Sequence, residues 1–280
     1  MTRHPNYVLA GVMGWPISHS RSPRIHNHWF TEHAIAGAYV PLAVEPGKLE
    51  TALRALPALG FAGCNLTIPH KETALRCLDH VDPAAARIGA VNCVVVGKDG
   101  SLTGKNYDGY GFVASLHEGA PGWKASDGPC IVIGAGGGAR AIVSGLIDAG
   151  AMEIRIYNRT LDRAQKIVAD FGPAVCAYPW DSRHDGLAGA GLLVNTTSQG
   201  MVGQEPLDLS LAALPRTAVV ADIVYAPLET KLLADARRKG ATAVDGLGML
   251  LHQARPAFRD WTGLMPEVTP QLRRLIEATL

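Results

Sequence analysis

The sequence predicts an α/β fold in two domains. Segments of strand and helix character alternate along both halves of the 280-residue chain, and residues 118–129, rich in Gly and Pro and without hydrophobic periodicity, separate the halves. Because one domain usually takes about 100–200 residues, the length suits two domains with full cores. Strands that are separated by helices favour a mainly parallel sheet with helices on both faces.

The first half alternates strands with helices. A helix is expected at 22–35, with Ser22 as its N-cap and Pro23 at its first helical position. The apolar run at 91–106 is interrupted by Asp99 and Gly100, which are typical of a hairpin turn. Further strands are expected at 7–14, 38–44 and 62–68, and further helices at 46–60, closed by Gly60, and at 69–79, begun by Pro69.

The second half reads as another run of strands and helices. The expected domains are therefore 1–117 and 118–246. The helical segment 247–280 is expected to return to the first domain, which is expected to be of mixed α/β type. Strands of the second domain are expected near 130–134, 153–158, 192–197, 218–224 and 241–245.

Charge and composition argue against several classes of function. The formal net charge is only +1, so there is no general electrostatic case for binding nucleic acid or an anionic membrane. The apolar run near the N-terminus is too short for a signal peptide, and no segment is long enough to cross a membrane. Five cysteines without a CxxC pair fit reduced thiols in the cytoplasm. No metal is expected, because the cluster His19, His26, His28 and His33 lacks cysteines or carboxylates at ligand spacing.

A glycine-rich turn in the second half indicates a nucleotide site. Gly134, Gly136 and Ala139 match the G-x-G-x-x-G/A pattern, directly after an apolar strand and before a helical segment that ends at Gly150. The first glycine permits the turn, the second lets backbone amides approach a pyrophosphate, and the small third residue lets the helix pack on the strand. We therefore expect a Rossmann-like, doubly wound domain that binds a dinucleotide.

The residues after the next strand indicate which dinucleotide. Where an NAD site commonly has a carboxylate for the ribose 2′-hydroxyl, this chain has Asn158 and Arg159, and Arg163 lies one turn along a helix that Thr160 can cap. A solvated pair of arginines is the ordinary alternative, but cations at a helix N-terminus oppose the helix dipole. Two guanidinium groups can hold a 2′-phosphate, so NADP is expected rather than NAD.

The first half offers polar residues where its elements begin and end. Ser20 and Ser22 precede or begin a helix, whose free amides suit a carboxylate, although Ser22 taken alone fits an ordinary N-cap better. Lys71 is expected in the first turn of a helix, whose dipole would lower the pKa of the ammonium and suit it to proton transfer. Surface lysines are commoner than catalytic ones. Asp108 begins a helix and is, by itself, more typical of a cap.

Eight short motifs follow one another along both halves. They are GWPISHSRSP, NLTIPHK, GAVN, NYDGYGF, GAGGGAR, NRTLDR, NTTSQGM and DGLGMLLHQ. In this order they resemble the shikimate dehydrogenase family, from about residue 10 almost to the C-terminus. A glycine loop that matched by chance would not bring the other seven motifs, so the resemblance is highly specific.

The resemblance implies an NADP-dependent oxidoreductase that interconverts 3-dehydroshikimate and shikimate, a reaction of chorismate and aromatic amino acid biosynthesis. It implies that Lys71 and Asp108 are the catalytic pair and leaves open which of them donates the proton. Met249 and Gln253 are four residues apart and share one helix face. The implied substrate contacts are Ser20, Ser22, Asn65, Thr67, Asn92, Tyr225 and Gln253; the implied cofactor contacts are Gly134, Ala135, Gly136, Gly137, Gly138, Asn158, Arg159, Thr160, Arg163, Ile223, Gly246 and Met249.

Two positions depart from the family's usual pattern. The family commonly has threonine between the Asn and Asp of NTDG, where it lines the substrate pocket, and this chain has Tyr107. The phenol could narrow the pocket, alter contacts to the ring hydroxyls or point away. Gly138 stands where alanine is common, and this milder change is expected to matter little.

Three other functions stay open. A quinate/shikimate or amino-shikimate dehydrogenase belongs to the same family; quinate-using relatives often favour NAD, so Arg159 and Arg163 count against it, whereas Tyr107 leaves room for it. A non-catalytic NADP-binding sensor would not need both Lys71 and Asp108. A folate-linked methylene dehydrogenase shares the two-domain plan but would not need the SHSRSP segment. The oligomeric state is expected to be monomer or homodimer.

Overall fold

The computed structural model describes residues 7–280 and divides the chain into two compact units. Residues up to 107 together with 253–279 form unit 1, and residues 108–252 form unit 2. The first boundary that we expected, after residue 117, lies later than the observed one after residue 107. The second, expected after residue 246, lies earlier than the observed one after residue 252. The expected absence of a signal peptide concerns a segment that lies partly outside the described residues. No helix in the described part of the chain is both long and apolar enough to span a membrane.

Unit 1 is built on a mixed six-stranded sheet. Its strand order is β2-β1-β3-β5-β6-β4, with parallel pairing among the first three strands and antiparallel pairing from β3 to β5 and from β5 to β6. The β5–β6 hairpin turns at Asp99 and Gly100, as expected. The strands are β1 (Val8–Gly14), β2 (Gly37–Ala43), β3 (Phe61–Leu66), β4 (His80–Val81), β5 (Cys93–Val96) and β6 (Leu102–Lys105).

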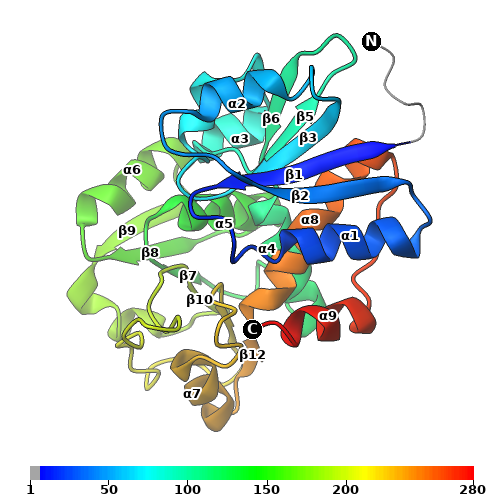
Figure 1. The fold of residues 1–280 in the computed structure, drawn as a ribbon. Coiled ribbons are helices and arrows are strands. Elements are labelled where there is room, and N and C mark those ends of the chain that lie inside the picture. Colours follow the sequence, from blue (N-terminus) through cyan, green and yellow to red (C-terminus); the bar gives the residue numbers. More distant parts are fainter. Residues whose placement is uncertain (1–6) are drawn as a thin grey trace. The chain divides into compact units, whose positions relative to one another are not determined.

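Helices cover both faces of this sheet. Figure 1 shows α2 (Leu49–Ala55) and α3 (Pro83–Ile88) on one side and α1 (Ser22–Glu32) on the other. The chain returns to unit 1 through the second half of α8 (Gly246–Thr262) and through α9 (Pro270–Glu277), which packs against α1. The expectation that the C-terminal helices pack back on the first domain is thereby confirmed.

An aromatic cluster holds α8 to unit 1. The ring of Phe258 packs against Trp29 and Phe30 of α1, with centroids 5.5 and 5.1 Å apart. The indole nitrogen of Trp261 donates to the carbonyl of Val94 at 3.2 Å. Because buried aromatic side chains remove large apolar areas from water, these contacts fix the second half of α8 on the α1 side of the sheet.

Two details of unit 1 differ from expectation. Arg21, rather than Ser22, is the N-cap residue of α1, and no side chain caps this helix. The helix expected at 69–79 is absent: the segment forms turns and a single 3-10 helix, η1 (Thr73–Arg76). The carbonyl of Lys71, which would accept a helical bond from four residues on, instead accepts one from the amide of Val91 at 2.8 Å. Pairing with the neighbouring segment thus replaces the α-helical bond.

Unit 2 is a parallel, doubly wound sheet with the order β12-β11-β10-β7-β8-β9. All five expected strands are present, and β9 is an additional edge strand that the sequence did not indicate, because it is short, half-exposed and ends in Pro179. The strands are β7 (Cys130–Ile133), β8 (Ile154–Asn158), β9 (Val175–Pro179), β10 (Leu192–Asn195), β11 (Val219–Asp222) and β12 (Thr242–Val244). The helices are α4 (Asp108–Gly119), α5 (Gly137–Asp148), α6 (Leu161–Phe171) and α7 (Lys231–Lys239).

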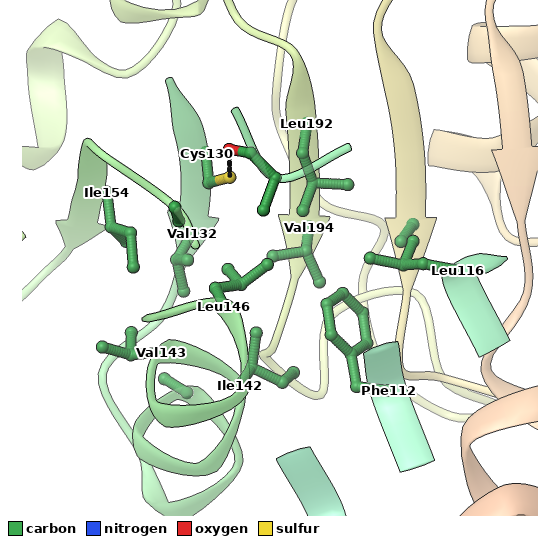
Figure 2. Close-up of a cluster of buried hydrophobic side chains, with 14 of the residues drawn as sticks. Phe112, Leu116, Cys130, Val132, Ile142, Val143, Leu146, Ile154, Leu192 and Val194 are labelled. Carbon is green, nitrogen blue, oxygen red and sulfur yellow. Dashed lines mark hydrogen bonds between the residues drawn. The ribbon is translucent and has the colours of Figure 1, made fainter. Parts of the chain in front are cut away.

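Helices α4 and α5 supply one half of the unit 2 core. Figure 2 shows Phe112 and Leu116 of α4 beside Ile142 and Leu146 of α5, facing the apolar side chains of the strands. The two helices cross closely at Gly109. A Cβ at this position would lie only 2.5 Å from the carbonyl oxygen of Ala141. This packing assigns α4 to unit 2 and explains why the unit boundary precedes the Gly- and Pro-rich segment.

Replacing Gly63 by alanine should destabilise unit 1. A Cβ at Gly63 would lie 2.0 Å from the carbonyl oxygen of Val94, the same atom that accepts the Trp261 hydrogen bond. Relief of this clash has to displace either the β3–β5 pair or α8, so the free energy of unfolding should fall by about 2 kcal/mol or more. Urea titration measures the change. Gly122→Ala is the matched control, because no atom lies within 4 Å of that Cβ position; equal stability of the two variants would contradict the prediction.

Candidate active site

Unit 1 gathers polar residues where its parallel strands end. Ser20 and Ser22 follow β1, while Asn65 lies near the end of β3 and Thr67 just beyond it. Ligands of α/β proteins commonly bind outside the carboxyl ends of the parallel strands. The sequence motifs of the first half therefore meet at one edge of one sheet.

Asn92 is the hydrogen-bonding centre of this edge. It is 2% exposed, and its carbonyl oxygen accepts bonds from the amide of Leu66 at 2.9 Å and from the side chain of Asn65 at 2.9 Å. Its side-chain oxygen accepts from the amide of Tyr107 at 2.9 Å, and its side-chain nitrogen donates to Gln253 at 3.4 Å. Three of the expected substrate residues, Asn65, Asn92 and Gln253, thus belong to one network.

Tyr39 is a member of this network that the motifs did not indicate. Its hydroxyl donates to the side-chain oxygen of Asn65 at 2.7 Å. Burial raises the pKa of the Tyr39 phenol well above its ordinary value, whereas a hydrogen bond from Ser22 opposes the shift. The phenol is therefore a neutral donor, which directs the amide nitrogen of Asn65 toward Asn92. The ring stacks on His26, with centroids 4.2 Å apart, and burial lowers the pKa of that histidine to about 3.

Ser20 and Ser22 lie at the start of α1. The side-chain oxygen of Ser20 accepts a hydrogen bond from the amide of Ser22 at 3.3 Å, and Ser22 is 8% exposed. The first turn of α1 lacks the free amides that we expected, because Pro23 has no amide hydrogen and the amide of Arg24 donates to the carbonyl of Arg21 at 3.0 Å. The hydroxyl groups of Ser20 and Ser22 are therefore the groups of this segment that suit an anion.

Thr67 and Lys71 follow β3. The amide of Thr67 donates to the carbonyl of Met13 at 3.0 Å, and a Cβ on Gly14 would lie 2.5 Å from the Thr67 methyl group. Lys71 is half-buried in the turns before η1. Because these turns replace the expected α-helix, the helix-dipole argument for Lys71 was wrong. The family resemblance remains the basis for its assignment.

Tyr107 turns its phenol toward α8. The hydroxyl donates to the carboxylate of Asp260, which the Lys105 ammonium also contacts at 2.8 Å. The sequence left open whether the phenol narrows the substrate pocket, alters contacts to the ring hydroxyls or points away. In the structure it is bound to Asp260 of α8. Asp108, the next residue, is 8% exposed and begins α4 in unit 2.

The glycine loop of unit 2 has the geometry expected from its motif. Gly134 has φ +110°, and a Cβ there would lie 2.6 Å from the hydroxyl of Thr196. Gly136 is the N-cap residue of α5, and neither it nor Gly137 has an atom within 4 Å of its Cβ position. Ala139 is fully buried against the sheet. The open N-terminus of α5, flanked by Ala135 and without an acidic residue in its first turn, favours a phosphate.

The arginine segment follows β8 at the same edge of the unit 2 sheet. Asn158 donates to the carbonyl of Thr160 at 2.7 Å, and Thr160 is the N-cap residue of α6 without a capping bond from its side chain. Arg159 and Arg163 are exposed, and neither guanidinium forms a hydrogen bond or ion pair within residues 7–280. Two unpaired cations beside an open helix terminus favour a phosphate group.

The remaining expected cofactor residues, Ile223, Gly246 and Met249, also lie in unit 2. A Cβ on Gly246 would lie 2.4 Å from the carbonyl oxygen of Ile223, and a Cβ on Gly138 would lie 3.3 Å from the Ile223 side chain. Met249 of α8 packs against the unit 2 core, and Tyr225 lies in the loop after β11. Gly138 therefore adjoins Ile223, and this close approach leaves little room for the alanine that is common in the family.

The described residues contain no group of three or more His, Cys, Asp or Glu side chains that could hold a metal ion. The polar groups at the sheet edges of unit 1 and unit 2 are amides, hydroxyls, cations and single carboxylates.

Known proteins match this chain over most of its length. A family model described as the shikimate dehydrogenase substrate binding domain matches residues 12–94, and one described as shikimate / quinate 5-dehydrogenase matches residues 121–224. Shikimate dehydrogenase (NADP(+)) of Paramagnetospirillum magneticum is 57% identical over 268 residues, which are 96% of this chain and 97% of that protein. The chain belongs to the shikimate dehydrogenase family.

Solved structures of related enzymes share the fold. Shikimate 5-dehydrogenase from Thermus thermophilus, in complex with NADP(H) and shikimate, matches with a TM-score of 0.87 at 36% identity, over 98% of this chain and 100% of the other. Quinate dehydrogenase from Corynebacterium glutamicum, in complex with NAD, matches with a TM-score of 0.90 at 32% identity, over 97% and 99% of the two chains. A shikimate 5-dehydrogenase and a quinate dehydrogenase therefore share the fold of this chain.

Asp222 is a further residue of the cofactor half that the sequence did not single out. It is 2% exposed at the end of β11, and its carboxylate accepts from Asn195 at 3.0 Å, from the amide of Val224 at 3.0 Å and from Thr230 at 2.8 Å. These bonds tie the loops after β10 and β11 together. An aspartate at the end of an apolar strand is the signal that the sequence offered.

Replacing Asp222 by asparagine should change how stability depends on pH. Burial raises the pKa of Asp222 from 3.8 to about 6, against the effect of its three hydrogen bonds. Between these values the folded protein retains a proton that the unfolded chain has lost. The free energy of unfolding of the wild type should therefore fall by about 3 kcal/mol, relative to Asp222→Asn, as the pH rises through this window.

Urea titrations of both proteins at about pH 4 and about pH 7 measure this difference. Glu205→Gln, at an exposed carboxylate, is the control and should track the wild type at both pH values. A stability difference between Asp222→Asn and wild type that is the same at both pH values would contradict the assignment.

Proposed function

We propose that this chain catalyses the NADP-dependent, reversible reduction of 3-dehydroshikimate to shikimate. The observation that carries the proposal is the match at 57% identity, over 96% of the chain, to an NADP-dependent shikimate dehydrogenase. The separate polar edges of unit 1 and unit 2 support it, because each contains the residues that its half of the reaction needs.

In this proposal unit 1 binds the substrate. Ser20 and Ser22, which lie just before and at the start of α1, would bind the shikimate carboxylate through their hydroxyl groups, since these can donate to an anion. Thr67 and the linked amides of Asn65, Asn92 and Gln253 would bind the ring hydroxyls. In the network Asn65 and Asn92 each use the oxygen and the nitrogen of the side-chain amide once, and Gln253 uses its oxygen, so the remaining donors and acceptors have fixed directions. Tyr225 of unit 2 is assigned as a further substrate contact by the resemblance.

The cofactor half of unit 2 fits NADP. The pyrophosphate would meet the N-terminus of α5 and the loop before it, at residues Ala135 to Gly138. The 2′-phosphate would meet Arg159 and Arg163, together with Asn158 and Thr160. Ile223, Gly246 and Met249 would border the nicotinamide. Bound NADP supplies or accepts the hydride, and no residue of the chain does so.

Lys71 and Asp108 are proposed as the acid–base pair. In the reduction, negative charge grows on the substrate oxygen and has to be met by a proton. Lys71 or Asp108 would supply it. The remaining residues bind and orient the substrate.

Quinate oxidation is a second candidate, because the quinate dehydrogenase structure matches this chain with a TM-score of 0.90. An absorbance assay of the reduced nicotinamide, with shikimate or quinate and with NADP or NAD, distinguishes the candidates. Shikimate with NADP should give the highest kcat/KM. NADP binding without turnover on either acid would instead indicate a sensor.

Replacing Arg159 by alanine should weaken the binding of NADP selectively. Loss of a charge-assisted contact to a phosphate costs about 1.5–3 kcal/mol, so the KM for NADP should rise at least about 10-fold. The KM for NAD, which lacks the 2′-phosphate, should change little. Lys124→Ala removes an exposed lysine of unit 2 as a control. A parallel rise in both KM values would show that Arg159 does not contact the 2′-phosphate.

Replacing Lys71 by alanine should lower turnover and leave binding largely intact. Loss of a general acid–base group reduces kcat by about 10²–10⁴-fold, while the KM for shikimate should change only slightly. Steady-state kinetics with NADP measure both quantities. The exposed Lys98, in the β5–β6 turn, provides a Lys98→Ala control. Turnover near the wild-type value would mean that Lys71 is not the acid–base group.

We further propose that the protein works in the cytoplasm as a monomer or homodimer. The five cysteines are all free thiols, which is usual for a protein in a reducing compartment. The net charge of +1 agrees with a small-molecule enzyme that binds neither nucleic acid nor an anionic membrane.

A further inference from the structure

Three polar side chains of unit 1 meet between the end of β6 and α8. The Tyr107 hydroxyl and the Lys105 ammonium both contact one oxygen of the Asp260 carboxylate, the lysine at 2.8 Å. The Asp260 side chain is only 11% exposed, whereas Arg259, which lies 3.6 Å from the other carboxylate oxygen, is 50% exposed. Asp260 is therefore paired mainly with Lys105 and Tyr107.

The Tyr107 hydroxyl is a protonated donor to Asp260. Burial, together with the hydrogen bond to Asp260, raises the pKa of the Tyr107 phenol well above its ordinary value. The phenol therefore stays protonated and donates to the carboxylate that the Lys105 ammonium also contacts. A hydrogen bond to a charged group contributes more than one between neutral groups.

This bond closes a ring of contacts that includes two of the proposed substrate residues. The amide of Tyr107 donates to Asn92 at 2.9 Å, and Asn92 donates to Gln253 at 3.4 Å. Gln253 and Asp260 are seven residues apart on α8, about two turns, and so lie on the same helix face. Tyr107 is thereby linked to α8 in two ways: directly through Asp260, and indirectly through Asn92 and Gln253.

We propose that Tyr107 and Asp260 are positioning residues that hold α8, and with it Gln253, in register with Asn92, so that both amides meet the substrate ring together. This inference rests on the proposed function, in which Asn92 and Gln253 contact shikimate. A threonine, the common residue at this position in the family, has no phenol to reach Asp260. The tyrosine thus adds an attachment to α8 that threonine cannot make.

The variants Tyr107→Phe and Asp260→Asn, singly and combined, test this inference. Tyr107→Phe keeps the ring and leaves Asp260 paired with Lys105, so folding should be preserved. Each single variant should raise the KM for shikimate about 5- to 10-fold, the equivalent of roughly one ordinary hydrogen bond. The kcat should stay within about twofold and the KM for NADP should not change, because neither residue belongs to the proposed acid–base pair or to the proposed cofactor contacts.

The double variant distinguishes positioning from separate effects. Since both substitutions break the same bond, Tyr107→Phe should add no more than about twofold to the KM of Asp260→Asn. Arg259→Gln is the control, because this exposed residue is farther from the carboxylate, and its KM for shikimate should equal that of the wild type.

Several outcomes would overturn the inference. An unchanged KM for shikimate in Tyr107→Phe would do so, as would multiplicative effects in the double variant. A fall in kcat and a rise in both KM values, accompanied by a lower Tm, would indicate a merely structural role. If the wild type did not oxidise shikimate at all, the proposed function would fail instead, so the two failures are distinguishable.

Discussion

Satisfaction of the buried polar groups of Asn92 is the constraint on which the substrate half depends. The residue is almost fully buried, and a buried amide or carbonyl without a partner costs about as much as a lost hydrogen bond. Its backbone and side chain together bond to the end of β3, the end of β6, Tyr107 and α8. Displacement of any one of these elements would leave a polar group of Asn92 unpaired, so the edge of the sheet forms as a unit.

Asp222 has a comparable place in the cofactor half, with a different electrostatic balance. Its carboxylate accepts three hydrogen bonds, yet burial outweighs them and raises the pKa of the group to about 6. Ionisation at neutral pH is therefore costly, and the bonds to Asn195, Val224 and Thr230 offset only part of that cost. The loops that carry Ile223 and Tyr225 are thus held by a group that opposes stability when charged, as is common at functional sites.

The two halves divide the chemistry between neutral and charged groups. In unit 1, amides, hydroxyls and a protonated phenol give fixed directions, which suits recognition of a ring that carries several hydroxyls. In unit 2, the exposed guanidinium groups of Arg159 and Arg163 and two open helix termini provide positive potential for phosphates. In the proposed function, discrimination between cofactors depends on Coulomb attraction, while discrimination between cyclic acids depends on hydrogen-bond geometry around Asn92.

Periodicity and turn residues in the sequence were sufficient for most elements, including the β5–β6 hairpin, the glycine loop and the C-terminal helices. These features depend on neighbours within a few residues, which a sequence displays directly. The helix expected at 69–79 failed because its backbone carbonyl at Lys71 pairs with Val91, a partner twenty residues away that no local pattern reveals. Ser22 is the first helical residue rather than the cap, because α1 begins one residue earlier than we expected, with Arg21 as its N-cap.

The ordered motifs by themselves determined the family, the cofactor class and the residues to which we assign roles, because those depend on which chemical groups the chain contains and in what order. Only the tertiary structure decided that Tyr39 bonds to Asn65, that Asp222 bonds to Asn195 and Thr230, and that the Tyr107 phenol binds Asp260. These contacts join residues far apart in the chain: Tyr107 and Asp260 are separated by 153 positions. Long-range pairing depends on how sheets and helices pack, and that is settled only when the whole unit has folded.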